Sequence, residues 1–568
     1  MTKWKLTRWA AAAIGAFVLS MTCAGAAMAD SAQTETSQQT QAAAITATAT
    51  IQSATIGSDK STVTVTAKTG GDLTGTDQKF YLFELKPYQD TLDGRTDYIA
   101  SATGTDLTWN FPLSQGSEAD RLYSSFVVAV YDVTKGAYTS ISEPHYITNP
   151  EAVAKNTAAF KDPLTKKGLV IEINMLSDAF DLGVKHVGTN IAFHQILGSG
   201  IDYTYDGKTY HFSKAVMEEY DRTISALSGK GMTVNAVILN GWNDATPDLI
   251  YPGTKKSNNA FYYLFNVATK EGFEQTRAII AFLAERYNGS DPNHGKISNW
   301  VIGNEINNQQ WNYTGAWDLT SYVKAYQKAF RVFYTAIKSA SANDRVYFSV
   351  DYNWNNEIDH KLKYGGKEVL DSFNSIANNW GQIDWGLAYH PYPCPMTDPN
   401  FWDDDQTGLV KNDINSPVIN FKNLTVLTDY MASSAFRAPS GNVRHIILTE
   451  EGFTAMNQKG EDVSKLQAAA YAYSYYMVDS NPYIDAYILS RQIDAPSEVN
   501  QKLAFGLWTC DMSKPNQIIA QKRRKIWQVF RDIDKKNATL EATEFAKEII
   551  GINKWSDVIE NFKWRSQE

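Results

Sequence analysis

The sequence predicts an α/β fold, a (β/α)8 TIM barrel preceded by a small all-β sandwich domain. From Gly168 onward, β-branched apolar runs alternate with helical periodicity, and eight strands and eight helices can be counted. Between residues 45 and 150, short strands alternate polar and apolar residues between Gly, Asp and Ser turns. Eight βα units over roughly 400 residues fit such a barrel with loop insertions. A doubly wound open sheet is the alternative, but no Gly-rich phosphate loop follows an early strand.

The N-terminus predicts export. Residues 1–29 contain a basic start, an apolar stretch and a small-x-small cleavage site at Ala27-Met28-Ala29. Residues 30–44 are rich in Ser, Thr, Gln and Ala, which suits a flexible tether. No other stretch is apolar over the ~20 residues that a membrane span requires. We therefore expect a secreted, extracellular protein without a membrane span, cleaved near Ala29.

The composition favours a carbohydrate as partner over a nucleic acid or a membrane. Of 568 residues, 12% are aromatic, with 15 Trp and 31 Tyr, which suits stacking on sugars but also occurs in large secreted proteins generally. A net charge of −9 without a long basic run argues against nucleic acids and anionic membranes. The oligomeric state stays open.

The cysteines predict no metal centre. Once a signal peptide is removed, only Cys394 and Cys510 remain, both in predicted loops of one barrel face. A disulfide and two unlinked thiols are both open in an oxidising compartment. Without a nearby histidine cluster, a structural zinc site is not expected. We expect no cofactor and no metal.

The first domain, residues 45–150, is expected to be a sandwich of the immunoglobulin or fibronectin kind. Its clearest strands are Thr62–Ala67, Phe80–Leu85 and Ser125–Tyr131. No acid, base or nucleophile constellation stands out in it. It is therefore either a sugar-binding module or a structural partner of the barrel.

The second domain, residues 151–568, contains the predicted barrel. Its eight candidate strands are Gly168–Ile173, His186–Phe193, Thr233–Leu239, Ile297–Glu305, Arg345–Tyr352, Ile383–His390, Arg444–Glu450 and Ile484–Ser490. Its clearest helices are Ser213–Ser228, Phe273–Tyr287, Ser321–Ser339, Leu424–Ala435, Ser464–Val478 and Lys522–Ile533.

Two of these strands end in a carboxylate. Glu305 closes predicted strand four and Glu450 closes predicted strand seven. The carboxyl ends of barrel strands surround one central site, so we expect the two side chains to meet there. Two carboxyl groups are the minimal equipment for hydrolysing a glycosidic bond, and their mutual charge raises the pKa of the one that stays protonated. The alternative is a purely structural pair of strand ends.

The same residues carry a family resemblance. Asn304-Glu305 after strand four, with a glutamate closing strand seven, resembles the clan A superfamily of (β/α)8 retaining glycoside hydrolases. The resemblance implies that Glu305 is the acid/base, that Asn304 binds the sugar 2-hydroxyl and that the strand-seven glutamate is the nucleophile. The string Glu450-Glu451-Gly452-Phe453 is similar to a Glu-x-Gly-aromatic motif of several clan families and places the nucleophile on Glu450. Because strand neighbours face opposite ways, Glu451 is the alternative, or else an orienting residue.

Four other strand ends supply candidate sugar-binding residues. On strand six, His390 and Tyr392 correspond to a His-x-Tyr of several clan families whose phenol bonds the nucleophile; otherwise both rings plug the barrel mouth. After strands three and five, Asn240, Trp242 and Trp354 either bind hydroxyls and pyranose faces or anchor loops. Strand eight departs from the clan pattern, because it ends in Ser490-Arg491-Gln492 rather than in the tryptophan often found as a sugar platform; Arg491 is the candidate there.

Two segments outside the strand ends also carry a signal. The stretch from His194 to Phe212 resembles a group of secreted bacterial barrel proteins of unknown function. In the loop 391–422, the run Asp403-Asp404-Asp405 suggests calcium, but a solvated acidic turn is the favoured interpretation.

We therefore predict a secreted retaining β-glycoside hydrolase that acts on an oligo- or polysaccharide by double displacement. The alternatives are a non-catalytic carbohydrate-binding barrel protein and a transglycosylase that uses the same two glutamates.

Overall fold

The computed structural model describes residues 45–356, 358–560 and 562. The predicted signal peptide, residues 1–29, and the predicted tether, residues 30–44, lie outside the described residues. Among the described residues, none of the helices has the length and apolar character needed to cross a membrane.

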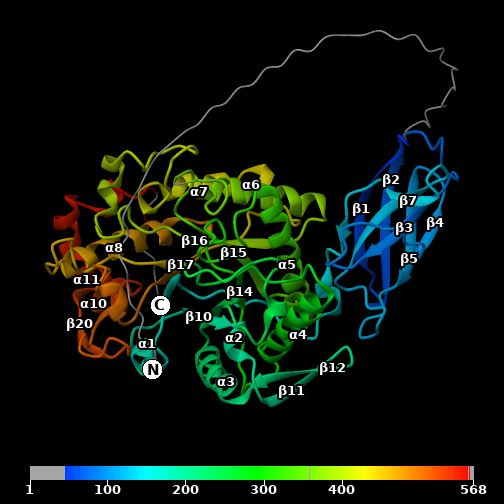
Figure 1. Cartoon of the computed structure of the whole chain (residues 1–568). Coiled ribbons are helices and arrows are strands. Elements are labelled where there is room, and N and C mark those ends of the chain that lie inside the picture. The colour runs from blue at the N-terminus through cyan, green and yellow to red at the C-terminus, as the bar shows by residue number, and fades with distance from the viewer. Residues whose placement is uncertain (1–44, 357, 561, 563–568) are drawn as a thin grey trace, which may run out of the picture. The chain divides into compact units, whose positions relative to one another are not determined.

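Two antiparallel sheets form the all-β part, as predicted (Figure 1, blue strands). One sheet has the order β1-β2-β5, with bounds Thr48–Ile56, Thr62–Gly70 and Asp106–Pro112. The other has the order β4-β3-β6-β7, with β8 paired to β6, and its bounds are Ala100–Ala102, Phe80–Leu85, Ser125–Asp132, Ala137–Ser140 and His145–Tyr146. Strict alternation in β5 turns Leu107, Trp109 and Phe111 inward, as a half-buried strand requires.

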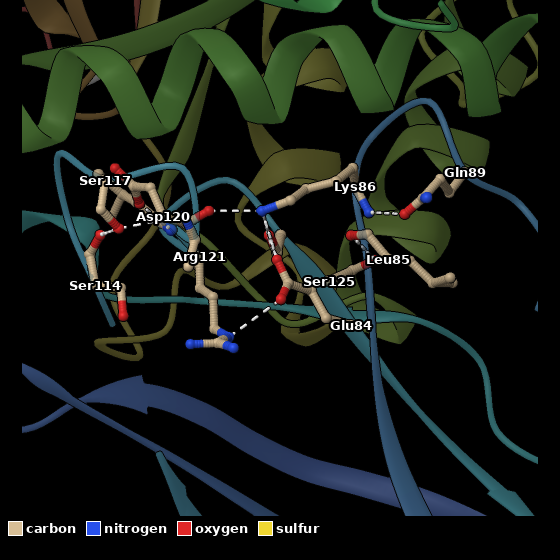
Figure 2. A network of polar contacts seen from close by, with 12 residues as sticks. Glu84, Leu85, Lys86, Gln89, Ser114, Ser117, Asp120, Arg121 and Ser125 are labelled. Carbon is tan, nitrogen blue, oxygen red and sulfur yellow. Dashed lines mark hydrogen bonds and ion pairs between the residues drawn. The ribbon is translucent and has the colours of Figure 1, made fainter. Parts of the chain in front are cut away.

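A compact polar network lies at one end of this all-β part (Figure 2). Glu84 accepts hydrogen bonds from Arg121 Nε at 3.1 Å and Ser124 Oγ at 2.7 Å, and it pairs with Lys86 at 2.5 Å. Lys86 also donates to the Asp120 carbonyl at 2.6 Å. The network therefore links the end of β3 to the segment that precedes β6.

Eight parallel strands close into the predicted barrel. Their order is β9-β10-β13-β14-β15-β16-β17-β18, with β18 paired back to β9. Their bounds are Lys167–Val170, His186–Ala192, Thr233–Leu239, Asn299–Ile302, Arg345–Asp351, Trp385–His390, Ile446–Glu451 and Ile484–Leu489. Small and β-branched side chains and one tyrosine form a buried cluster on the barrel strands: Val301, Tyr347, Ala388, Ile447, Ala486 and Ile488. This part of the barrel is therefore a packed core.

The helices surround these strands (Figure 1). Those that follow the barrel strands are α1 Leu176–Asp181, α2 Phe193–Ile196, α3 Lys214–Gly229, α4 Lys270–Arg286, α5 Leu319–Ala340, α6 Gly366–Asn379, α7 Leu424–Met431, α8 Ser464–Ser480 and α9 Pro496–Val499. A hairpin, β11 Gly200–Tyr205 and β12 Lys208–Ser213, precedes α3. The chain ends with strands β19 Trp508–Cys510 and β20 Ala520–Arg523 and with helices α10 Lys525–Asp532 and α11 Lys536–Ile550.

Two predicted strands run three residues too far. We predicted strand one to run to Ile173, but β9 ends at Val170. We predicted strand four to run to Glu305, but β14 ends at Ile302. Gly303 has a φ of 74° and Glu305 a φ of 39°, and neither angle continues an extended strand. Glu305 therefore lies in a turn three residues beyond the strand.

Candidate functional site

Glu305 is held at the carboxyl end of the barrel by its own backbone. Its φ of 39° lies in the left-handed region, which costs a residue other than glycine roughly 1 kcal/mol or more. The N–H of Glu305 donates to Ser349 Oγ on β15 at 2.7 Å, and its carbonyl accepts from Asn308 N–H at 2.8 Å. These bonds fix the strained turn and with it the direction of the side chain.

Glu450 reaches the same site because β17 is irregular. Leu448 pairs with Tyr487 and Glu451 with Leu489, so between these pairs β17 contains one residue more than β18. Such a bulge interrupts the alternation of side chains. As a result Thr449 and Glu450 both turn towards His390, and the side chain of Glu450 is 41% exposed whereas Glu451 is fully buried.

His390, the last residue of β16, lies between the two carboxyl groups. Its Nδ1 is 2.8 Å from Glu305 Oε1 and 4.0 Å from Glu450 Oε2. Its Nε2 is 3.0 Å from Thr449 Oγ1. With the ring 1% exposed and bonded at both nitrogens, His390 is fixed in position and contacts both acids.

Tyr392 fixes the other oxygen of Glu450. Its phenol donates to Glu450 Oε1 at 3.1 Å. The Tyr392 ring is buried and packs against Phe505 at a centroid distance of 5.7 Å. A hydroxyl that donates to a carboxylate stabilises its ionised form and limits its rotation.

The two carboxyl groups lie in different surroundings, one buried and one exposed. Burial raises the pKa of Glu305 to about 7, although the hydrogen bond from His390 acts in the opposite direction. Burial lowers the pKa of His390, but its hydrogen bond to Glu305 and the charges of Glu305 and Glu450 outweigh this, and the net shift is upward. Glu305 and His390 thus share a proton near neutral pH, while Glu450 is open to water and accepts from a phenol.

A third carboxyl group, that of Asp351, lies close enough to Glu305 to influence its pKa. Asp351, the last residue of β15, accepts from Asn307 Nδ2 at 2.6 Å and its N–H donates to Asn307 Oδ1 at 2.9 Å. Burial raises the pKa of Asp351. This two-way bond ties the turn after Glu305 to strand β15.

The family comparison matches the part of the chain that contains the barrel. A model of a protein family described as a family of unknown function, DUF5722, matches residues 159–558, more than half of the chain. The chain belongs to this family. No curated protein matches it significantly.

Solved structures with a similar fold share little sequence with this DUF5722 protein. A family 39 glycoside hydrolase from the gut symbiont Bacteroides cellulosilyticus WH2 is 15% identical over 84% of this chain and 79% of its own, with a TM-score of 0.43. A family 1 β-glucosidase from Thermotoga maritima is 13% identical over 65% and 85%, with a TM-score of 0.38. A β-glucuronidase from Bacteroides uniformis is 9% identical over 86% and 50%, with a TM-score of 0.36. Likenesses at these values carry no conclusion about activity.

Two further predicted residues of this DUF5722 protein lie near the surface of the barrel end. Asn304 is half-buried next to Glu305, and among the described residues its side chain makes no hydrogen bond. Trp242 is half-buried, donates from Nε1 to Asp244 at 2.6 Å and packs against Tyr263 at 5.2 Å. Both side chains are accessible to a ligand.

Three predicted residues are engaged in the protein instead. Trp354 is fully buried and donates to the Ile414 carbonyl at 3.0 Å, so neither face of its ring is open to a sugar. Asn240 is buried and its amide donates to the Leu249 carbonyl at 2.8 Å. Arg491 is half-buried in an ion pair with Glu498 at 2.5 Å. Trp354 and Asn240 are thus buried and bonded to loop carbonyls, which favours the loop-anchoring alternative.

Sequence reasoning missed Ser349, Thr449 and the pairing of Asp351 with Asn307. A signal was present in β15, where Ser349 and Asp351 are polar residues two positions apart near the end of a strand whose middle is apolar. Residues with this spacing share one face, and buried polar side chains need partners. The pattern therefore marks the face of β15 that supports Glu305.

The cysteines and the acidic run complete the predicted features. No disulfide joins Cys394 and Cys510 within the described residues. The solvated acidic turn is wrong for Asp404, which is buried in the 3-10 helix Phe401–Thr407, accepts from Cys394 N–H at 2.8 Å and from Asn420 at 2.5 Å. Burial raises its pKa to about 7. Across the described residues, no group of three or more His, Cys, Asp or Glu side chains could hold a metal ion.

Proposed function

We propose that this protein is a retaining β-glycoside hydrolase in which Glu450 is the nucleophile and Glu305 the acid/base. The observation that carries the proposal is the imidazole of His390, which contacts carboxyl groups from two different strand ends. One of these groups has a pKa of about 7 and the other is exposed beside a phenol donor. Pairs of carboxyl groups with opposite environments are typical of glycosidase acid and nucleophile roles.

The spacing favours retention of configuration. Retaining enzymes hold the two carboxyl groups about 5–5.5 Å apart, whereas inverting enzymes leave about 6.5–9.5 Å for a water molecule. Glu305 Oε1 and Glu450 Oε2 lie 2.8 Å and 4.0 Å from the same nitrogen. The shared nitrogen keeps these two oxygens close together, which supports a retaining separation of the two carboxyl groups.

The proposed reaction has two displacements. Glu450 attacks the anomeric carbon while Glu305 gives its proton to the leaving glycosidic oxygen, so the C–O bond to the leaving group breaks and an ester to Glu450 forms. Glu305, now ionised, then removes a proton from water. The resulting hydroxide equivalent attacks the anomeric carbon, the ester breaks and Glu305 is protonated again. Asn304, with a free amide next to the acid, is positioned for a sugar hydroxyl.

Two further residues keep the groups in position. Tyr392 orients Glu450 through its hydrogen bond, and His390 orients Glu305 through another. We also propose export, on the basis of the sequence of residues 1–29.

A screen against β-linked plant, fungal and host glycans tests the proposal, with the anomeric configuration of the first product followed by NMR. We expect Glu305→Gln and Glu450→Gln each to lower kcat by about 10²–10⁴-fold or more, while both proteins fold normally. Azide added to Glu450→Ala should restore turnover and give a glycosyl azide of inverted configuration, because a small anion then replaces the carboxylate.

Three results contradict the assignment. Near-normal turnover of Glu450→Gln excludes Glu450 as the nucleophile, and a large loss only at Glu451 moves the role by one residue. An inverted first product from the wild type excludes double displacement. Tight glycan binding without any hydrolysis favours a binding protein, and transfer to a sugar acceptor in place of water identifies a transglycosylase.

A further inference from the structure

The loops after β13 and β14 carry a group of three aromatic rings that the proposed mechanism does not use. We call Phe261, Tyr262 and Trp311 the aromatic stack. Phe261 and Trp311 are nearly parallel, with ring centroids 4.8 Å apart and an interplanar angle of 18°. Tyr262 lies 6.4 Å from Trp311 at 29°. Phe261 is 57% exposed although it is a large apolar side chain, so the outer face of the stack is open to water.

The stack is built on backbone that two loops hold in common. Phe261 N–H donates to the Gln310 carbonyl at 2.8 Å, and Tyr313 N–H donates to the Tyr262 carbonyl at 2.9 Å. Tyr263 and Tyr313 form a parallel bridge between the loops. The loop after β13 and the loop after β14 are therefore joined by main-chain bonds at the stack, and the rings are presented on a fixed frame.

The aromatic stack is connected through the backbone to the turn that contains Glu305. The Glu305 carbonyl accepts from Asn308 N–H at 2.8 Å, and the Asn308 carbonyl accepts from Trp311 N–H at 3.0 Å. Two consecutive turns thus lead from the acid to the stack. At its inner end, burial and the charge of Glu450 raise the pKa of Tyr262, so the phenol lies within the electrostatic reach of that carboxylate.

We infer that the aromatic stack binds the sugar ring of the leaving group, on the side of the scissile bond that Glu305 protonates. This inference rests on the proposed function and names a substrate class for it: β-linked oligo- or polysaccharides with a pyranose ring on the leaving side. The C–H face of a pyranose is flat and apolar and fits an exposed aromatic ring. The acid must approach the leaving oxygen, so a binding surface on the same turn contacts the leaving sugar.

Paired substrates separate this role from a general effect on activity. The assay uses β-linked trisaccharides and β-glycosyl fluorides of the gluco, galacto, manno and xylo series, and it compares kcat/KM within each series that the wild type hydrolyses. A fluoride has the same reacting sugar but no leaving ring. For Phe261→Ala and Trp311→Ala we expect kcat/KM on the trisaccharide to fall about threefold to tenfold further than on the fluoride.

Two variants serve as controls. Phe261→Trp keeps an aromatic face and should retain trisaccharide hydrolysis. Tyr98→Ala removes another exposed aromatic side chain, 41% exposed in the all-β part, and should change neither rate. Because Phe261 is exposed, its alanine variant is expected to fold, and circular dichroism checks this.

Each other outcome overturns the inference. Equal losses on trisaccharide and fluoride, or no loss on the trisaccharide, show that the stack does not contact a leaving sugar. If the wild type hydrolyses a fluoride but none of the trisaccharides, the glycosidase proposal stands and the inference fails. If it hydrolyses neither, the proposed function fails and the inference fails with it.

Discussion

His390 makes the two carboxyl groups interdependent. Its Nδ1 contacts both, and its Nε2 is held by Thr449, so the imidazole cannot turn away from either acid. A proton on Glu305 and a proton on His390 are two states of one hydrogen bond. The ionisation of the acid is therefore a property of the pair.

The first prediction concerns pH. The first displacement needs protonated Glu305, whose pKa burial raises to about 7. As the pH rises through that value the proton is lost, so kcat/KM should fall about tenfold per pH unit above pH ~7. A pH profile of kcat/KM on a hydrolysed substrate measures this limb.

His390→Leu supplies the control for this profile. The hydrogen bond and charge of His390 lower the pKa of Glu305, so their removal should move the alkaline limb to higher pH, together with a lower maximal rate. A limb that stays in place, or moves to lower pH, contradicts the assignment of the limb to Glu305.

The second prediction concerns Glu451. Both of its carboxyl oxygens are buried without a hydrogen-bond partner among the described residues, and burial raises its pKa well above the usual value. The unfolded chain releases this proton above pH ~4.3, but the folded chain keeps it, so the free energy of unfolding falls as the pH rises from there. Glu451→Gln lacks this titration. Its Tm relative to the wild type should therefore rise between pH 5 and pH 8, with activity retained.

A Tm difference that is constant over this pH range contradicts the prediction. Loss of activity in Glu451→Gln, with Glu450→Gln still active, contradicts the choice of nucleophile as well.

Single residues could be predicted from the sequence where the signal lies in the neighbouring residues. Glu305 and Glu450 were identifiable because each comes within three residues of the end of an apolar run. The burial of Trp354 could not be predicted, because it depends on the loop that contains Ile414, 60 residues further along the chain. The irregular pairing of β17 was hidden as well, because it depends on the register with β18 and leaves no mark in the sequence.

At the level of helices and strands, existence was more predictable than ends. All eight barrel strands were predicted, yet strand four was extended over Gly303 to Glu305. The run Trp300 to Ile302 is apolar, and its residues do not predict the left-handed turn that follows. Helix α7 likewise ends at Met431, four residues before the predicted Ala435.

The third prediction concerns the start of α4, the helix that follows the loop of the aromatic stack. Thr269 Oγ1 accepts from Gly272 N–H at 3.1 Å and from Asn266 Nδ2 at 2.9 Å. Thr269→Ala removes this cap and should lower the free energy of unfolding by about 1 kcal/mol. Thr269→Ser keeps the oxygen and should recover most of it. Urea denaturation measures both, and equal stability of the two variants would exclude a capping role.

On the scale of the chain as a whole, the all-β part and the barrel share contacts. Tyr146 N–H donates to the Trp380 carbonyl at 2.9 Å, and the Arg331 guanidinium of α5 lies 4.9 Å from the centre of the Tyr146 ring. Near the hairpin, the Arg277 guanidinium lies 5.4 Å from the Tyr123 ring and 5.0 Å from the Tyr205 ring. Buried contacts of this kind couple the two parts during unfolding.

The fourth prediction tests this coupling at Gly381. A Cβ at Gly381 would lie 2.8 Å from His145 Nε2 and 2.8 Å from Thr148 Cγ2, and its φ is 97°. Gly381→Ala should lower the Tm of a single unfolding transition. Gly441→Ala is the matched control, because Gly441 has a φ of 84° but no atom within 4 Å of a Cβ. If both variants lower the Tm equally, backbone strain alone accounts for the effect at Gly381, and its contact with His145 and Thr148 contributes nothing.

The main-chain bonds between the loops after β13 and β14 have a consequence for how this family can diversify. Backbone N–H and carbonyl groups are present whatever side chains the loops carry, so the frame that faces Glu305 does not depend on Phe261 or Trp311. Rings on this frame can be exchanged, enlarged or removed without moving the acid. Relatives with different sugars as natural substrates are therefore expected to differ first at these ring positions and to keep the backbone pairing beneath them.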